Sequence, residues 1–232
     1  YKIALPSPSL FGQFKNLTDI NIVLTGLLKM GFDKVFEVAR AAEAVSIATQ
    51  DYLKNNKLKK PVISTACPAV VEIILMRFHS LRENLLPILS PAAIAAKMAR
   101  DEAIKEGIDP KDIGIFFISP CPAKVYALKS AKMTGQSLLD GVISQSEVYF
   151  KLLSVMNSID KPLKLSKAGF SGLGWGRSGG ESDGVIGRYI HCDGVPGVLS
   201  VLREIEDEKL GDIDFVELNI CPGGCVGGVL NI

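Results

Sequence analysis

The 232-residue sequence lacks several features that would assign it at once to a class of protein. It has no run of about 18 or more uncharged apolar residues, so we expect no membrane-spanning helix. Its formal net charge is only +1, so the basic surface typical of a nucleic-acid-binding protein is not expected. The first residues, YKIALPSPS, do not combine a basic segment with an apolar one, as a signal peptide would.

Histidine is scarce, and cysteine is present in an odd number. Neither of the two histidines, His79 and His191, has a partner at the spacing of a metal site. Five cysteines without a secretory signal do not suit a framework of disulfides, so we expect the reducing cytoplasm. The five are Cys67, Cys121, Cys192, Cys221 and Cys225.

Short apolar runs alternate with longer amphipathic ones, a pattern typical of strands that alternate with helices. We predict strands at 2–5, 34–38, 61–67, 113–121 and 214–221, and helices at 16–31, 41–56, 91–107 and 195–210. Residues 141–156 are predicted to be a strand that runs into a helix. This alternation predicts an α/β fold of mainly parallel sheet flanked by helices, in two lobes, roughly 1–108 and 109–232.

We expect one domain over residues 1–232, cut from a longer protein, because the chain begins at Tyr1 within an apparent strand. The irregular region is GFSGLGWGRSGGESDG, residues 169–184. A loop of this length is usually functional or disordered. Its segment 172–180 could bind phosphate, but it matches neither the dinucleotide-binding nor the P-loop pattern.

Three cysteines share a local design, since each ends an apolar run and is followed by proline: Cys67, Cys121 and Cys221. Proline is favoured at the first position of a helix, so each thiol is predicted at a strand's carboxyl end and a helix start. Ligands of open α/β sheets bind at that edge, and a helix start stabilises a thiolate. Cys192, in YIHCDG, lacks this design and is interpreted as a structural thiol.

With Cys225, these thiols would suit a 4Fe–4S cluster, which is held by four thiolates. Structural zinc is a rival, although four-cysteine zinc sites usually use two close pairs and only CPGGC is present. Buried apolar thiols are the other alternative. Lys124 would project towards the Cys121 end of its helix and could neutralise an anionic cofactor, or it is an ordinary exposed lysine. The glycines at 223, 224, 227 and 228 allow the backbone to approach a bulky group, or only form a turn.

Together, these segments resemble the active-site domain of the FeFe-hydrogenases. That family has the signatures TSCCP, PCxxK and CxxxC followed by glycines; here STACP (64–68), PCPAK (120–124) and CPGGCVGG (221–228) occur in the same order. Segments 25–38, 89–113 and 141–148 also look like family segments, so the likeness covers essentially the whole chain. The resemblance implies two α/β lobes with a metal cluster between them.

The resemblance also implies a cofactor. A 4Fe–4S cubane would be held by the thiols matching the family ligands, and Cys225 would bridge it to a di-iron subcluster with CO and cyanide ligands. Lys124 would donate a hydrogen bond to a cyanide. The cubane ligands would be Cys67, Cys121, Cys221 and Cys225. The implied partners are a ferredoxin or iron–sulfur electron-transfer domain, and maturation factors without which the di-iron unit would be absent.

The sequence departs from the family at the positions that move protons. Ala66 stands where the proton-transfer thiol is found, and Ala48 and Thr49 stand near where acidic residues are expected. Ser119 replaces a methionine, whereas Ser90 matches a serine of the proton path and is equally a helix N-cap. Because alanine cannot relay a proton, fast turnover is not expected. The pattern resembles the divergent branch to which a sensory role is ascribed, in which signalling domains are attached.

Two functions therefore remain. The first is slow or sensory hydrogen oxidation and proton reduction, with Lys124, Cys225, Ser119 and Glu181 as catalytic-pocket residues. The second is a non-catalytic 4Fe–4S module that resembles the hydrogenase-like proteins of iron–sulfur assembly. Lys124 and the glycines after Cys225 favour the first, and Ala66 favours the second.

Overall fold

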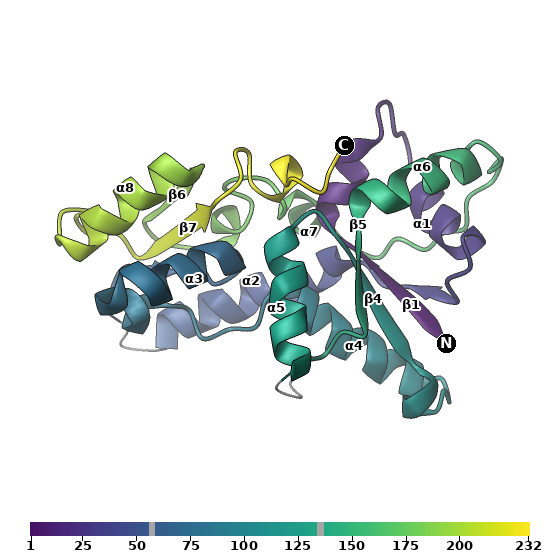
Figure 1. Cartoon of the computed structure of the whole chain (residues 1–232), viewed down its shortest axis with the longest axis horizontal. Coiled ribbons are helices and arrows are strands. Elements are labelled where there is room, and N and C mark those ends of the chain that lie inside the picture. The colour runs from purple at the N-terminus through teal and green to yellow at the C-terminus, as the bar shows by residue number, and fades with distance from the viewer. Residues whose placement is uncertain (56–58, 134–136) are drawn as a thin grey trace.

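The computed structural model describes residues 1–55, 59–133 and 137–232, and it confirms an α/β fold (Figure 1). Two parallel sheets lie in two halves of an elongated molecule. The first sheet has the strand order β2-β1-β4-β5 and the second has the order β3-β7-β6. None of the helices in the described part of the chain combines the length and apolar character that crossing a membrane requires.

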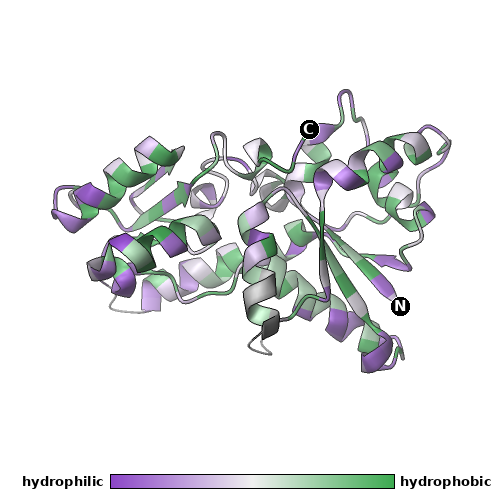
Figure 2. Cartoon of the chain, viewed as in Figure 1, coloured by the Kyte–Doolittle hydropathy of each residue, from purple (hydrophilic) through white to green (hydrophobic). Residues whose placement is uncertain are grey.

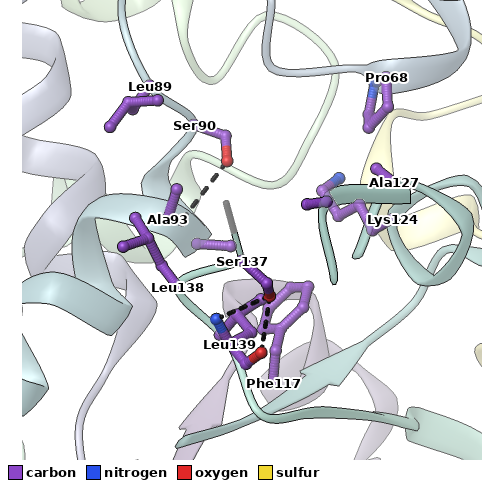
Figure 3. Close-up of a pocket in the computed structure, with 12 residues that line it drawn as sticks. Pro68, Leu89, Ser90, Ala93, Phe117, Lys124, Ala127, Ser137, Leu138 and Leu139 are labelled. Atoms are coloured by element: carbon purple, nitrogen blue, oxygen red, sulfur yellow. Dashed lines mark hydrogen bonds between the residues drawn. The ribbon is translucent and has the colours of Figure 1, made fainter. Parts of the chain in front are cut away.

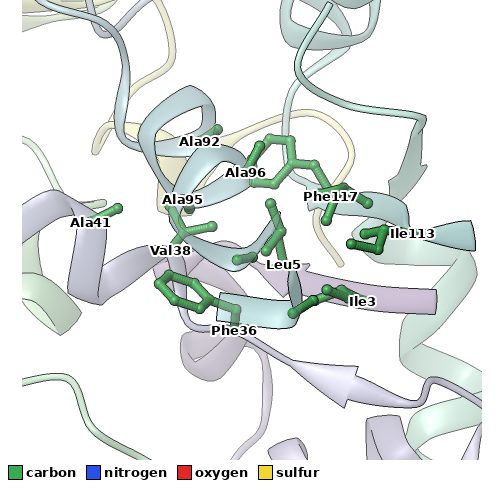
Figure 4. Close-up of a cluster of buried hydrophobic side chains, with 13 residues drawn as sticks. Ile3, Leu5, Phe36, Val38, Ala41, Ala92, Ala95, Ala96, Ile113 and Phe117 are labelled. Carbon is green, nitrogen blue, oxygen red and sulfur yellow. The ribbon is translucent and has the colours of Figure 1, made fainter. Parts of the chain in front are cut away.

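The first sheet is covered by helices on both faces. Its strands are β1 (Lys2–Pro6), β2 (Lys34–Val35), β4 (Gly114–Ser119) and β5 (Gly141–Ser144). Helices α2 (Val38–Asn55) and α4 (Pro91–Lys105) pack on one face, and α1 (Ile20–Lys29) and α6 (Gln145–Met156) pack on the other. Because strand side chains alternate, Ile3 and Leu5 enter the cluster under α2 and α4 (Figure 4), while Ala4 enters the opposite one.

The second sheet is smaller. Its strands are β3 (Val62–Ile63), β6 (Tyr189–Asp193) and β7 (Phe215–Asn219). Helices α3 (Pro68–Arg77) and α8 (Val195–Glu206) bury Val70, Ile74 and Leu202 against one face. Figure 2 shows apolar residues gathered on strands and inner helix faces, with hydrophilic residues concentrated at outer surfaces.

Helix α2 contacts the cores of both sheets. Val38 and Ala41, in its first turns, pack in the cluster on the first sheet. Tyr52 and Leu53, in its last turns, pack against Phe215 of the second sheet. One continuous helix therefore packs in the cores of both halves.

Several predicted boundaries were wrong. The division near residue 108 does not separate the sheets, because the first sheet takes strands from both sides of it and so does the second. The helix predicted at 16–31 begins only at Ile20, because Asn16 has a φ of 59° and Asp19 caps the helix through the Asn21 N–H. The strand predicted at 61–67 is only Val62–Ile63. Strand β6 was not predicted, and residue 56, the last of one predicted helix, lies outside the described residues.

The region predicted as a long loop at 169–184 is ordered. It begins with the short helix α7 (Phe170–Gly174) and ends with a turn of 3₁₀ helix at Ser182–Gly184. Helix α7 packs on α2 so closely that a Cβ on Gly172 would lie 2.2 Å from the carbonyl oxygen of Ala39. The glycine at this position therefore permits the contact between the two backbones.

Gly172→Ala is expected to lower the free energy of unfolding by about 2–3 kcal/mol, because the added methyl group must push the two backbones apart. Urea denaturation followed by circular dichroism measures the change. Gly12→Ala is the matched control, since a Cβ there meets no atom within 4 Å, and its effect is expected to stay within about 0.5 kcal/mol. Equal stability of the two variants would contradict this account of the α2–α7 contact.

Candidate functional site

Four cysteines lie at the carboxyl ends of strands from both sheets. Cys67 follows β3 and is the N-cap of α3, and Cys121 follows β4 directly before α5 (Pro122–Met133). These two helix starts were predicted. The helix start expected at Pro222 was wrong, because Gly223 and Gly224 take φ values of 78° and 83°, which end regular helix. Cys225 instead begins a single turn of 3₁₀ helix.

These four thiols, termed the thiol cluster, all interact electrostatically with the side chain of Lys124. The cluster comprises Cys67, Cys121, Cys221 and Cys225, which are all free and partly buried. The Nζ atom of Lys124 lies 3.7 Å from the Sγ atom of Cys225. Burial disfavours the ammonium, yet the ionised thiols of Cys225, Cys121 and Cys67 hold its pKa above the usual lysine value.

The thiols also act on one another. Burial raises the pKa of Cys221, and the charges of Cys121, Cys67 and Cys225 raise it further, while the ammonium partly compensates. Four thiols from three separate segments thus share one electrostatic environment around a single cation. Ionising all four of these partly buried thiols would cost free energy if no positively charged group lay beside them.

The donor set fits an iron–sulfur cluster. The described residues contain no group of three or more His, Cys, Asp or Glu side chains placed to hold a single metal ion. A 4Fe–4S cluster makes a different demand, because four thiolates hold one cluster of four irons. Four thiols without a histidine, arranged around a lysine, are chemically suited to that anionic group.

The glycines of CPGGCVGG bring other parts of the backbone close. A Cβ on Gly224 would lie 2.6 Å from the Ser178 nitrogen, and one on Gly228 would lie 2.5 Å from the Pro120 oxygen. The Ser178 N–H donates to the Gly223 carbonyl at 2.9 Å. The glycines therefore join the third cysteine segment to segments 176–178 and 120–121, a role that neither prediction for them included.

A small cavity, the cluster pocket, lies beside Cys225 and has a volume of about 40 Å³. Its walls include Ala66, Ser90, Lys124, Trp175, Glu181 and Cys225. The pocket therefore brings together three of the predicted catalytic residues and the alanine that replaces the family's thiol. Ser90 also has the predicted capping role, accepting a hydrogen bond from the Ala93 N–H at 3.5 Å.

Ser119 has a different role from the pocket residues. Its hydroxyl accepts a hydrogen bond from the Cys121 N–H at 3.1 Å and lies 3.3 Å from the Cys121 carbonyl oxygen, to which it donates. The side chain is fully buried. Ser119 thus holds the backbone of a thiol-cluster residue in place.

Glu181 is a buried carboxyl group in the wall of the cluster pocket. Ser64 donates a hydrogen bond to its Oε2 atom. Burial raises the pKa of Glu181 to about 8, against the effect of the Ser64 hydrogen bond and with support from the charge of Glu217. The carboxyl is therefore mostly protonated at neutral pH and can hold or release a proton there.

Glu217, in the middle of β7, was missed as a functional residue. Its carboxylate accepts hydrogen bonds from the N–H groups of Gly179, Glu181 and Ser182, at 2.8–3.1 Å, and from the Ser182 hydroxyl and the Asn219 amide. A charged residue inside the apolar run DFVELNIC was the available signal. Within segment 172–180, the Gly179 N–H donates to this carboxylate and is therefore not available to a phosphate.

The remaining candidates lie elsewhere. Cys192, on β6, packs against the core of the second sheet, which supports its interpretation as a structural thiol. Its Sγ atom lies 3.8 Å from the Asp193 carbonyl oxygen. His79 and His191 are exposed. Thr49 is buried, and its hydroxyl has no hydrogen-bond partner among the described residues.

The free energy of unfolding is expected to depend on the protonation of Glu181. Its pKa is about 8 in the folded chain and about 4.5 for the ordinary carboxyl, so the folded state holds an extra proton between these values. The stabilisation from this extra proton is fully present below about pH 4.5 and is lost as the pH rises to about 8. Glutamine does not titrate, so Glu181→Gln removes this pH dependence. The difference in unfolding free energy between wild type and variant should therefore change by up to about 5 kcal/mol between these pH values. Denaturation of the metal-free proteins at several pH values measures this, and parallel pH profiles would contradict it.

Comparisons with known proteins point to one family. The family model described as "Iron only hydrogenase large subunit, C-terminal domain" matches residues 1–160. Iron hydrogenase 1 of Clostridium pasteurianum is 24% identical over 212 residues, which cover 84% of this chain and 34% of that protein. The chain therefore spans about a third of the length of this curated relative.

Solved structures agree in fold. An FeFe-hydrogenase, HydA(deltaEFG), described in a study of stepwise H-cluster assembly, matches with a TM-score of 0.72 and 18% identity, over 100% of this chain and 79% of that one. The apo FeFe-hydrogenase HydA1 from Chlamydomonas reinhardtii, in a variant form, matches with a TM-score of 0.72 and 17% identity, over the same shares of the two chains. These likenesses place the two sheets and their helices in an arrangement shared with those proteins.

Proposed function

Because the chain belongs to the iron-only hydrogenase family, in the part that forms the C-terminal domain of the large chain, we propose that its thiol cluster binds a 4Fe–4S cubane. The observation that carries this proposal is the convergence of four thiols from three segments on one lysine. Iron–sulfur cofactors are typical of this family, and a set of four thiolates is what a cubane requires.

Within this proposal, Lys124 compensates the negative charge of the bound cofactor. Its ammonium is held beside Cys225, and nearby thiolates favour its charged form. The other three thiols hold only the cubane, whereas Cys225 also faces the cluster pocket. Cys225 would hold a di-iron subcluster on the pocket side, and that group would supply the chemistry that splits or forms dihydrogen.

The residues of the pocket support slow hydrogen turnover, in either an enzyme or a sensor. Ala66, in the pocket wall, has no proton to give. Glu181 lies in the same wall, hydrogen-bonded to Ser64, and its pKa of about 8 makes it a group that can hold a proton near neutral pH. Proton transfer through this buried carboxyl replaces the missing thiol.

We place this domain in a longer cytoplasmic protein, with electrons supplied by a ferredoxin or an iron–sulfur domain. A signalling domain downstream would fit the sensory role. The thiol cluster is only partly buried, so an electron carrier can approach it. Maturation factors of the hydrogenase type would supply the di-iron subcluster.

Two observations favour a second function. The cluster pocket measures only about 40 Å³, and Ala66 in its wall has no thiol. A module that binds only the cubane, like the hydrogenase-like proteins of iron–sulfur assembly, needs no larger space. The two functions share the thiol cluster and differ in whether the pocket receives a di-iron unit.

Infrared spectroscopy of protein matured with hydrogenase assembly factors separates the two functions. The hydrogenase function predicts absorption bands from metal-bound CO and cyanide. Four irons per chain without these bands would contradict it and leave the cubane-only module. Protein made without the assembly factors is the control and should show no such bands.

Substitution of single cysteines tests the ligand set. Replacing any member of the thiol cluster by serine is expected to remove most of the iron retained after anaerobic reconstitution, because serine is a poor cluster ligand. Cys192→Ser is the matched control and should retain the wild-type iron content. Iron analysis and electron paramagnetic resonance of the reduced protein provide the measurement. Iron content that is equal in all variants, or one zinc ion bound by the same thiols in place of iron, would contradict the proposal.

A further inference from the structure

Strand β6 forms one edge of the second sheet and bonds to its neighbour β7 through every second residue. The Phe215 N–H donates to the Arg188 carbonyl at 3.3 Å, and the Gly194 N–H donates to the Asn219 carbonyl at 3.0 Å. Bonding groups in a parallel ladder alternate along the strand, so the residues at 190 and 192 also bond towards β7. The N–H and carbonyl groups at 189, 191 and 193 therefore point away from the sheet.

These outward backbone groups belong to Tyr189, His191 and Asp193. Within the described chain, none of their N–H groups has a hydrogen-bond partner. The carbonyl of Asp193 has only the neighbouring Cys192 thiol, at 3.8 Å. The outer edge of β6 is thus a row of backbone donors and acceptors that a further strand could satisfy.

The edge also lacks the features with which proteins prevent such pairing. Native edge strands are commonly blocked by lysine, proline or a bulge. Strand β6, YIHCD, has neither lysine nor proline, and its five residues pair one to one with β7. The opposite edge of the same sheet is covered, because the Leu86 N–H donates to the Ile63 carbonyl of β3 at 2.9 Å.

The side chains of β6 are suited to pairing with a second copy of the same strand. A closed two-fold dimer pairs identical strand edges in antiparallel directions. With His191 on the two-fold axis, Tyr189 of each copy lies opposite Asp193 of the other, and all the outward backbone groups find partners. The phenol can donate to the carboxylate across the two strands, which favours this register.

Exposed apolar side chains at the two ends of β6 fit the same arrangement. Ile186, before the strand, is 70% exposed, and Val195, after it, is 50% exposed. Antiparallel pairing brings the Ile186 end of one copy to the Val195 end of the other. Both apolar side chains would then be removed from water, at each end of the paired strands.

We propose that the outer edge of β6 is the interface of a homodimer, in which the β6 strands of two copies pair antiparallel about His191. The second sheet then continues across the dimer, with three strands from each copy. In the described part of the chain, the outward residues of β6 line neither the cluster pocket nor the groove beside Lys124 and Phe117 (Figure 3). The dimer therefore needs no bound cofactor and is independent of the proposed function.

Sedimentation equilibrium of the purified metal-free protein, over a range of concentrations, tests the proposal. A strand pair of this length buries less than a standard interface, so a dissociation constant of about 1–100 μM is expected. Wild-type protein that remains monomeric at about 1 mM would overturn the proposal.

Charge substitutions at the two-fold axis test the register. His191→Lys and His191→Glu each bring like charges together and should weaken dimerisation about tenfold or more. An equimolar mixture of the two variants should restore dimerisation, as a mixed dimer that native mass spectrometry identifies by its mass. His79→Lys, at another exposed histidine, is the matched control and should dimerise as the wild type does.

Two results with these variants would overturn the proposal: dimerisation of each variant alone at the wild-type level, or a mixture that does not recover. Should the His191 variants fail to fold, Tyr189→Lys replaces them, because its ammonium faces Asp193 of the second copy and should lower the dissociation constant. An unchanged constant in that variant would be equally decisive against the interface. Since no iron is present, none of these outcomes bears on the thiol cluster, which the iron analysis and the infrared spectra report.

Discussion

The rest of the site depends on the hydrogen bonds that the buried carboxylate of Glu217 accepts. It lies in the central strand of the second sheet, is 3% exposed, and accepts hydrogen bonds from both backbone and side chains. An unpaired buried charge would cost several kcal/mol, so the segment that supplies these donors is strongly held. That segment carries Glu181, and its neighbours at 176–178 contact the CPGGC turn. The carboxylate of Glu217 thus fixes the position of the Glu181 carboxyl relative to Cys221 and Cys225.

A second buried carboxylate anchors the other end of the same stretch. Glu37, before α2, accepts hydrogen bonds from the Ser166 hydroxyl and from the N–H groups of Lys167 and Ala168, at 2.6–3.2 Å. A glycine-rich segment with little apolar content cannot fold by burial alone. Charged acceptors supplied by the rest of the molecule compensate for that deficit, which explains why this stretch is ordered.

Much of the fold and part of the site could be predicted from the sequence because the relevant signals are local. Alternating apolar runs predicted the parallel sheets, Ser90-Pro91 predicted the start of α4, and the Cys-Pro steps predicted the starts of α3 and α5. The rest depends on contacts far apart in the chain. Strand β3 pairs with β7, some 150 residues later, over only two residues, and the role of Glu217 depends on donors about 35 residues upstream. Strand β6 carries polar residues and lies at a sheet edge, so it lacks the apolar pattern of a buried strand.

The thiol cluster draws its members from both sheets, with Cys121 after β4 of the first and Cys67 and Cys221 after strands of the second. A group bound by all of them would be a mechanical cross-link between the two halves, in addition to the connection that helix α2 provides. Its presence or loss would change the stiffness of the whole molecule. A cofactor in this position could therefore report its own state as a change in the motion between the two sheets, which any attached domain could follow.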